Sequence, residues 1–291
     1  MSYNYEELSF DEARDLLRQW RESNERRSEE VVELWLTILS DGLDKIGNEK
    51  HVLLEQVIFA ALDCHCYSVA NNCIAILSNE FPGSLRVKRY QAARLEAEEK
   101  YTEAVMLLDK IVRADETNSA VYKRMIAIRK ARGEIKQAIE DLVDYLKKFI
   151  SDVEAWQELC ELYLQMQDYS RAAYCAEELI LHQPHNHLMH QRLADIRYTM
   201  GGIENMELAK SYYCQALKLN PDNMRALLGL FLTTNNLLNH YKSSGNSSKR
   251  KEVWKLCQWA QSQATKRQQA ARAAPAAPGL SQMMLALAIT E

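Results

Sequence analysis

Five side chains that can bind a transition metal fall within sixteen residues of this sequence: Cys175, His182, His185, His187 and His190. A zinc site needs four such thiolate or imidazole ligands converging on one ion. Cys175 lies two helical turns before the histidines, while Pro184 and Asn186 are typical of a turn between two helices. We therefore predict a solvated turn without a metal; a zinc site and a pH-sensitive contact are the alternatives. If the histidines have a further role, we expect it to be as exposed contact residues beside this turn.

A second group of possible metal ligands is Cys64, His65 and Cys66, with Cys73 further along. This group lacks a full ligand set, so we predict structural cysteines. Cys160 stands where a small core residue is expected, and we interpret it as part of the core. Seven cysteines, an odd number at irregular spacing, favour reduced thiols in a cytosolic protein over a disulfide framework.

Catalytic signatures are absent from the 291 residues. No phosphate-binding loop, dinucleotide fingerprint, nucleophile elbow or zinc-protease motif occurs. We predict no enzyme, no cofactor and no metal. The net charge of −4 and the lack of aromatic residues among the basic ones predict no nucleic-acid partner. Charges run through the first twenty residues and the longest apolar run is about six residues, so we expect neither a secretory signal nor a membrane span.

The elements that position these residues repeat every 34 residues. One series of small residues is Ala70, Ala104, Ala138 and Ala172, followed after 37 residues by Ala209. A polar series has the same steps: Ser84, Asn118, Asp152, Asn186 and Asn223. The polar residues predict helix starts, because such side chains accept a backbone N–H there. The alanines let paired helices approach closely, and the three extra residues fall near "GGIEN" (201–205), between two helices.

Two antiparallel helices in 34 residues are the pattern of the tetratricopeptide repeat. The clearest copy is "AWQELCELYLQMQDYSRAAYCAEELILHQP" (155–184), and nine glycines and five prolines in the whole chain also favour helices. We predict an all-α fold, a right-handed superhelical solenoid of antiparallel helix pairs.

The predicted domain organisation has four parts: capping helices (1–50), five repeats (51–222), a degenerate sixth repeat with a capping helix (223–267) and a weakly ordered alanine- and proline-biased tail (268–291). Ser9 and Glu12 predict a capping box for the first helix, and Ser28 and Gly47 are expected to start and stop the second. The polar stretch 242–251 is expected to separate the last two helices.

A partner-binding groove is expected on the first helices of the repeats, which line the concave face of such solenoids. Its predicted residues are Arg86, Arg89, Lys123, Lys130, Glu154, Gln157, Glu161, Gln191 and Tyr198. Such a groove would grip an acidic or helical segment at its basic end. Ordinary surface charge is the alternative.

Several stretches resemble one family, subunit 2 of the endoplasmic reticulum membrane protein complex. The similar strings include "EFPGSLRVKR" (80–89), "IAIRKARG" (126–133), "DVEAWQELCELY" (152–163), "AAYCAEELILHQPHNHL" (172–188) and "QALKLNPDNMRALLGL" (215–230). The resemblance covers most of residues 9 to 262, and the tail from about 268 departs from it.

The resemblance implies a non-enzymatic scaffold on the cytosolic side of the endoplasmic reticulum membrane. It would hold cytosolic segments of membrane subunits and a globular cytosolic subunit, without spanning the membrane itself. The complex would insert tail-anchored and multi-pass membrane proteins. A co-chaperone-type receptor for peptide tails is the rival function. Arg89 and Lys123 supply charge for its carboxylate clamp, but no matching asparagines lie on those helices.

Overall fold

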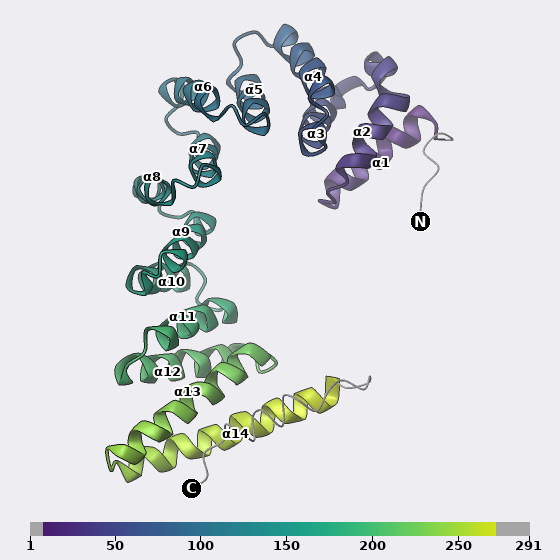
Figure 1. The fold of residues 1–291 in the computed structure, drawn as a ribbon. Coiled ribbons are helices and arrows are strands. Elements are labelled where there is room, and N and C mark those ends of the chain that lie inside the picture. Colours follow the sequence, from purple (N-terminus) through teal and green to yellow (C-terminus); the bar gives the residue numbers. More distant parts are fainter. Residues whose placement is uncertain (1–7, 272–291) are drawn as a thin grey trace. The chain divides into compact units, whose positions relative to one another are not determined.

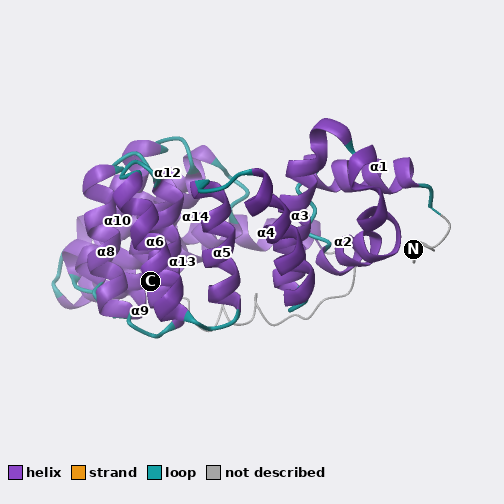
Figure 2. Ribbon diagram, turned by 90° about the horizontal axis from the view of Figure 1, so that it is seen from above, coloured by secondary structure: helices purple, strands orange, loops and turns teal. Residues whose placement is uncertain are grey.

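The computed structural model describes residues 8–271, and every regular element in that range is a helix joined to the next by a short loop (Figures 1 and 2). The chain divides into two compact units, residues 1–134 and residues 135–291. Within each unit, consecutive helices pack against each other as antiparallel neighbours (Figure 1). The predicted all-α tetratricopeptide architecture is confirmed.

Unit 1 begins with two helices ahead of the repeats, α1 (Phe10–Glu22) and α2 (Ser28–Leu34). A π-helical turn (Trp35–Leu39) and two short 3₁₀ turns (Ser40–Lys45, Gly47–Glu49) follow α2. The repeat helices of this unit are α3 (Lys50–Asp63), α4 (Tyr67–Glu80), α5 (Leu85–Ala97), α6 (Tyr101–Ala114) and α7 (Ser119–Ala131).

Unit 2 contains longer helices toward its end. Its helices are α8 (Ile135–Lys148), α9 (Val153–Gln165), α10 (Tyr169–His182), α11 (His187–Met200), α12 (Ile203–Leu219), α13 (Met224–Ser243) and α14 (Ser247–Ala271). The partner of α13 is α14, which presents Val253, Cys257 and Ala260 to it as buried residues.

Both 34-residue series lie where they were predicted, although the side chains of Ser84 and Asn118 make no capping hydrogen bond. The five polar residues, from Ser84 to Asn223, are the N-caps of α5, α7, α9, α11 and α13. The side chains of Asp152, Asn186 and Asn223 each accept a backbone N–H of the following turn. All five alanines, from Ala70 to Ala209, are fully buried, as close approach of paired helices requires.

A third series with the same spacing closes the turn inside each repeat. His65, Glu99, Gly133 and Gln167 all have positive φ, between 58° and 76°. The N–H after each of them bonds back to a carbonyl of the last helical turn, as when Glu134 N–H donates to Arg129 O at 3.0 Å. This left-handed helix end satisfies carbonyls that would otherwise lack a partner. Only one of the four is glycine, so the series was not visible in the sequence.

The three surplus residues of the fifth repeat lengthen a helix rather than a loop. α12 has 17 residues, whereas α4, α6, α8 and α10 each have 14. Two glycines with positive φ, Gly201 and Gly202, form the whole connection before it. The extra residues therefore become about one more helical turn.

Three boundary predictions need correction. Ser28 is the first residue of α2 and not its cap, because its hydroxyl donates to Asp63 Oδ2 at 2.7 Å. The polar stretch 242–251 is mostly helical, since only residues 244–246 separate α13 from α14. The helix α14 continues to Ala271, past the predicted boundary at 267, and the rest of the predicted weakly ordered tail lies outside the described residues.

The left-handed turn positions predict stability effects of opposite sign. No heavy atom lies within 4 Å of a Cβ added at Gly133, so Gly133→Ala should cost only the backbone strain, about 1 kcal/mol. Gln167→Gly should remove such strain and raise the free energy of unfolding by up to about 1 kcal/mol. Urea unfolding followed by circular dichroism measures both. Gln165→Gly, two residues away inside α9, is the matched control and should destabilise. Equal effects at 165 and 167 would contradict this account.

A close contact inside unit 2 predicts a second effect. A Cβ added at Gly229 would lie 2.4 Å from the ring of Tyr213, which is buried and donates a 2.6 Å hydrogen bond to Asp195. Alanine is the better helix former by about 1 kcal/mol, but overpacking costs about 1–3 kcal/mol. We expect Gly229→Ala to lower the melting temperature, and Tyr213→Leu to remove most of that sensitivity in the double variant. A stabilising Gly229→Ala would show that this ring does not pack on α13.

Candidate partner-binding groove

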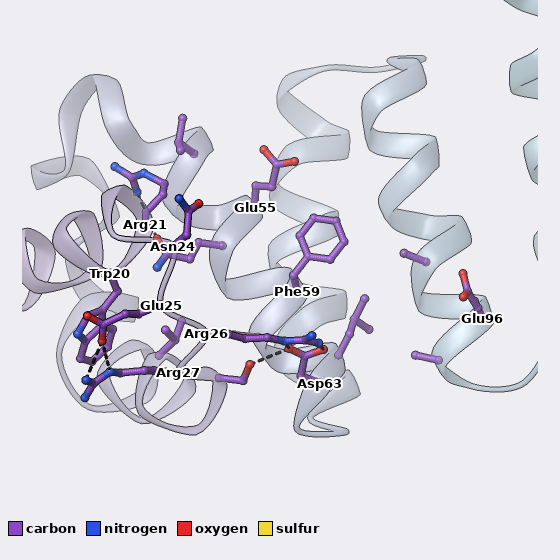
Figure 3. Close-up of a pocket in the computed structure, with 18 of the residues that line it drawn as sticks. Trp20, Arg21, Asn24, Glu25, Arg26, Arg27, Glu55, Phe59, Asp63 and Glu96 are labelled. Atoms are coloured by element: carbon purple, nitrogen blue, oxygen red, sulfur yellow. Dashed lines mark hydrogen bonds and ion pairs between the residues drawn. The ribbon is translucent and has the colours of Figure 1, made fainter. Parts of the chain in front are cut away.

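A groove of about 730 Å³ runs along unit 1 (Figure 3). Its walls come from the end of α1, the loop into α2, and the inner faces of α3, α5 and α7. The first helices of the repeats therefore line the hollow in this unit. Its lining residues include Glu25, Arg26, Glu55, Phe59, Ala60, Asp63, Ala93, Glu96, Ala97 and Arg124.

The floor of the groove is apolar and made of small residues. Ala60 and Ala93 are buried on α3 and α5, and the ring of Phe59 meets the ring of Tyr90 edge to face at 5.9 Å. Small side chains at the contact between α3 and α5 leave room above them. The floor can therefore receive apolar side chains of another segment.

One end of the groove carries a bidentate ion pair between the α1–α2 loop and α3. Arg26 Nε and Nη2 lie 2.8 and 2.5 Å from the two carboxylate oxygens of Asp63, which also accepts from the Ser28 hydroxyl (Figure 3). These bonds, chiefly that from Arg26, lower the pKa of Asp63 against the opposing effect of burial. The pair fixes the otherwise irregular loop against the repeats.

Glu55 on α3 pairs with two of the predicted groove residues. Arg86 forms an ion pair with it, and Arg89 Nη2 lies 3.6 Å from its other oxygen. Arg86 Nε also donates to the Tyr90 hydroxyl at 2.7 Å. Glu55 lines the groove, whereas the two arginines stand beside it. Glu55 therefore compensates part of the charge of Arg86 and Arg89 inside unit 1, and that part is not available to a partner.

A less well paired carboxylate lies further along the groove. Burial raises the pKa of Glu96, and the charge of Arg124 only partly opposes this. Arg124 Nε is 3.2 Å from Glu96 Oε2, yet that oxygen is buried without a hydrogen bond. Glu96 therefore keeps an unused acceptor, which a donor on a bound segment reaches only if the side chains that bury it move.

Arg124, Glu96 and Phe59 are groove residues that the sequence prediction missed. Their predicted neighbours on α7, Lys123 and Lys130, do not line the groove, and each already interacts with another group of the chain. Arg124 directly follows Lys123 in the sequence, and it is Arg124 that lines this groove. Both residues are basic, so residue type alone could not show whether Lys123 or Arg124 faces the groove.

The predicted residues of unit 2 are mostly engaged within that unit. Glu161 accepts from Arg192 Nη2 at 3.3 Å, and the Tyr198 hydroxyl accepts from Asn236 at 2.9 Å. Glu154 is exposed and interacts within the chain, while Gln157 is half-buried. Gln191 is only 7% exposed, so binding there requires other groups to move.

The buried amide of Gln191 belongs to a polar network between consecutive repeats. Asn223 Nδ2 donates to Gln191 Oε1 at 2.9 Å and also faces His187 Nδ1 at 2.9 Å. His187 Nε2 lies 3.0 Å from Asn220 Nδ2. The network ties the start of α11 to the cap of α13. His187 therefore has a structural role.

The remaining ligand types around this turn do not form a metal site. His190 is buried, and its Nε2 donates to Pro184 O at 2.9 Å, which corrects the expectation of an exposed contact residue. His182 and His185 are exposed. Burial raises the pKa of Cys175 to about 12. Between residues 8 and 271, no group of three or more His, Cys, Asp or Glu side chains could hold a metal ion.

The other cysteines also have structural environments. Cys160 is buried and its thiol donates to Ala172 O at 3.5 Å. Burial raises the pKa of Cys73 to about 12. Cys64 and Cys66 are half-buried in the α3–α4 turn.

None of the described helices combines the length and apolar character that crossing a bilayer requires.

Comparison with known proteins extends these observations. Residues 71–216 match the family model described as the EMC2 TPR-like repeat domain. ER membrane protein complex subunit 2-A of Xenopus laevis is 44% identical over 265 residues, 91% of this chain and 89% of the relative. The subunit 2 of Dictyostelium discoideum is 31% identical, covering 85% and 80% of the two chains.

A solved structure supports the fold alone. The C-terminal part of a TPR repeat-containing protein from Cytophaga hutchinsonii superposes with a TM-score of 0.56 at 15% identity, covering 86% of this chain and 94% of that one. The repeat register, the matched domain and the identity to relatives over most of both chains agree. The chain belongs to the ER membrane protein complex subunit 2 family.

Proposed function

We propose that this chain is a non-enzymatic scaffold subunit of an endoplasmic reticulum membrane protein complex. It works at the cytosolic side of the membrane, attached through its partners. It holds cytosolic segments of membrane-embedded subunits and a cytosolic subunit, and so supports insertion of tail-anchored and multi-pass membrane proteins. Membership of the subunit 2 family supports this role.

The observation that carries the proposal is the groove of unit 1. An apolar floor of alanines and Phe59 lies between carboxylates and arginines on its walls. Such a surface suits an extended or helical segment that has apolar and charged positions in alternation. Arg124 and Glu96 on the walls would pair with charged positions of that segment, Glu96 after the side chains that bury its Oε2 have moved.

The charge of the groove argues against a receptor for acidic peptide tails. Glu25, Glu55, Asp63 and Glu96 all line it, and they balance the arginines there. A free C-terminal carboxylate would therefore meet no net positive charge, and it would find the arginines already paired. A free acidic C-terminal peptide should therefore bind weakly or not at all in a fluorescence anisotropy titration.

The scaffold proposal predicts loss of partners on charge reversal in the lining of the groove. Arg27→Glu with Arg124→Glu should reduce the co-purified complex subunits by about fivefold or more, because both arginines line the groove and each reversal replaces attraction to an acidic position of the segment by repulsion worth about 1 kcal/mol. Affinity purification of the full chain from cells, followed by quantitative mass spectrometry, measures the change.

The matched control is Lys110→Glu with Arg113→Glu, the same charge change on α6, whose exposed side chains lie away from the groove. It should leave co-purification unchanged. Unaltered recovery of every subunit with the Arg27 and Arg124 variant, in a chain that keeps its circular dichroism spectrum, would overturn the proposed role of the groove.

A further inference from the structure

A second hollow, of about 350 Å³, lies on unit 1 between α2 and the α3–α4 turn. Its lining residues are Glu29, Val32, Glu33, Leu36 and Thr37 from α2 and the π-helical turn, and Cys64 and Cys66 from the α3–α4 turn. Apolar groups form its walls, and the glutamates stand at its edge. The groove of unit 1 shares none of these seven residues.

Leu36 is the exposed apolar side chain of this hollow. It is 57% exposed, while Trp35 and Leu39 of the same π-helical turn are buried. The Thr37 hydroxyl donates to Glu33 O at 2.8 Å and covers a carbonyl of the widened turn. Single π-helical turns often occur at functional sites. A partner that covered Leu36 would remove apolar surface from water.

The two cysteines give the hollow a neutral wall. Both are half-buried, and the Cys66 thiol points toward Cys64 O at 3.7 Å. Burial, with the negative charges of neighbours that include Glu29 and Glu30, raises the pKa of Cys64. Its thiol therefore stays protonated at neutral pH and acts as a small apolar group.

The edge of the hollow is acidic, and the nearest basic side chains, Arg26 and Arg27, line an adjoining hollow together with Glu29 and Glu30. Glu29, Glu30 and Glu33 form no ion pair with any residue that the structure describes. By contrast, Glu49 and Glu80 of the same unit are each paired with basic side chains. Two carboxylates of the lining, Glu29 and Glu33, thus stand at an apolar hollow without an ion pair of their own.

We propose that this hollow is a second docking site, and that its occupant is a partner polypeptide segment with an aliphatic or aromatic side chain flanked by lysine or arginine. The apolar side chain would fill the space beside Leu36, Cys64 and Cys66. The flanking cation would pair with Glu29 or Glu33. An anionic lipid surface or a nucleic acid fits poorly, since both would be repelled by the same carboxylates.

Photo-crosslinking tests the occupant directly. Leu36 is replaced by p-benzoyl-phenylalanine in the full chain, expressed in cells, and the crosslinked peptide is sequenced after irradiation. We expect a segment of another polypeptide with an apolar residue within four positions of lysine or arginine. The matched position is Leu181 on α10, 74% exposed and outside the hollow. Identical products at both positions, lipid adducts, or a segment without basic residues would overturn the proposal.

The cysteines provide an independent readout. Alkylation of Cys64 and Cys66 should be at least tenfold slower in the purified assembly than in the isolated chain at the same pH, while buried Cys73 stays unreactive in both. Glu29→Lys with Glu33→Lys should restore the faster rate. Glu103→Lys with Glu140→Lys, an equal charge change at exposed positions away from the hollow, should not. Equal rates in both states refute docking at this hollow, whatever happens at the groove.

Discussion

Close approach of paired helices at the fully buried alanines is the constraint on which the other features depend. Without a side chain beyond Cβ at Ala70, Ala104, Ala172 and Ala209, the second helix lies against the first in the pairs α3–α4, α5–α6, α9–α10 and α11–α12. Each pair then needs a sharp reversal, which the left-handed residues at the 34-residue spacing provide. The caps start the next pair in register. The close helix packing, the left-handed turn and the N-cap therefore all recur with the same 34-residue spacing.

The sequence predicts the helices and their starts well because their signals are local. The capping role of Asn186 and the packing role of Ala172 both depend on residues that are close to them in the sequence. Gln191 and His187 were harder to interpret, because their partner Asn223 lies a full repeat away. The polar type of Gln191 predicted an exposed side chain, yet an amide network between consecutive repeats buries this side chain. The prediction that Ser28 caps α2 failed for the same reason, because its hydroxyl donates instead to Asp63, which is distant in the sequence.

The groove of unit 1 shows why binding residues are less predictable than fold. Arg86 and Arg89 have the basic side chains and helix positions that the sequence suggested, but Glu55 takes up much of their charge. The residue with an unused acceptor, Glu96, is recognised only when its burial and the orientation of Arg124 are both known. Ion pairs between helices decide which charges remain available to a partner, and the sequence of one helix does not determine those pairs.

The lengthened α12 has a consequence for how such chains can vary. Three residues rotate a helix by about 300°, only 60° short of a full circle. Because they enter at the start of α12, Ala209 and everything after it keep the same faces. Relatives of this chain can therefore gain or lose residues at helix beginnings in steps of about one turn. Changes of one or two residues inside the packed part of α12 would instead turn its packing face by about 100° or 200° away from its neighbour.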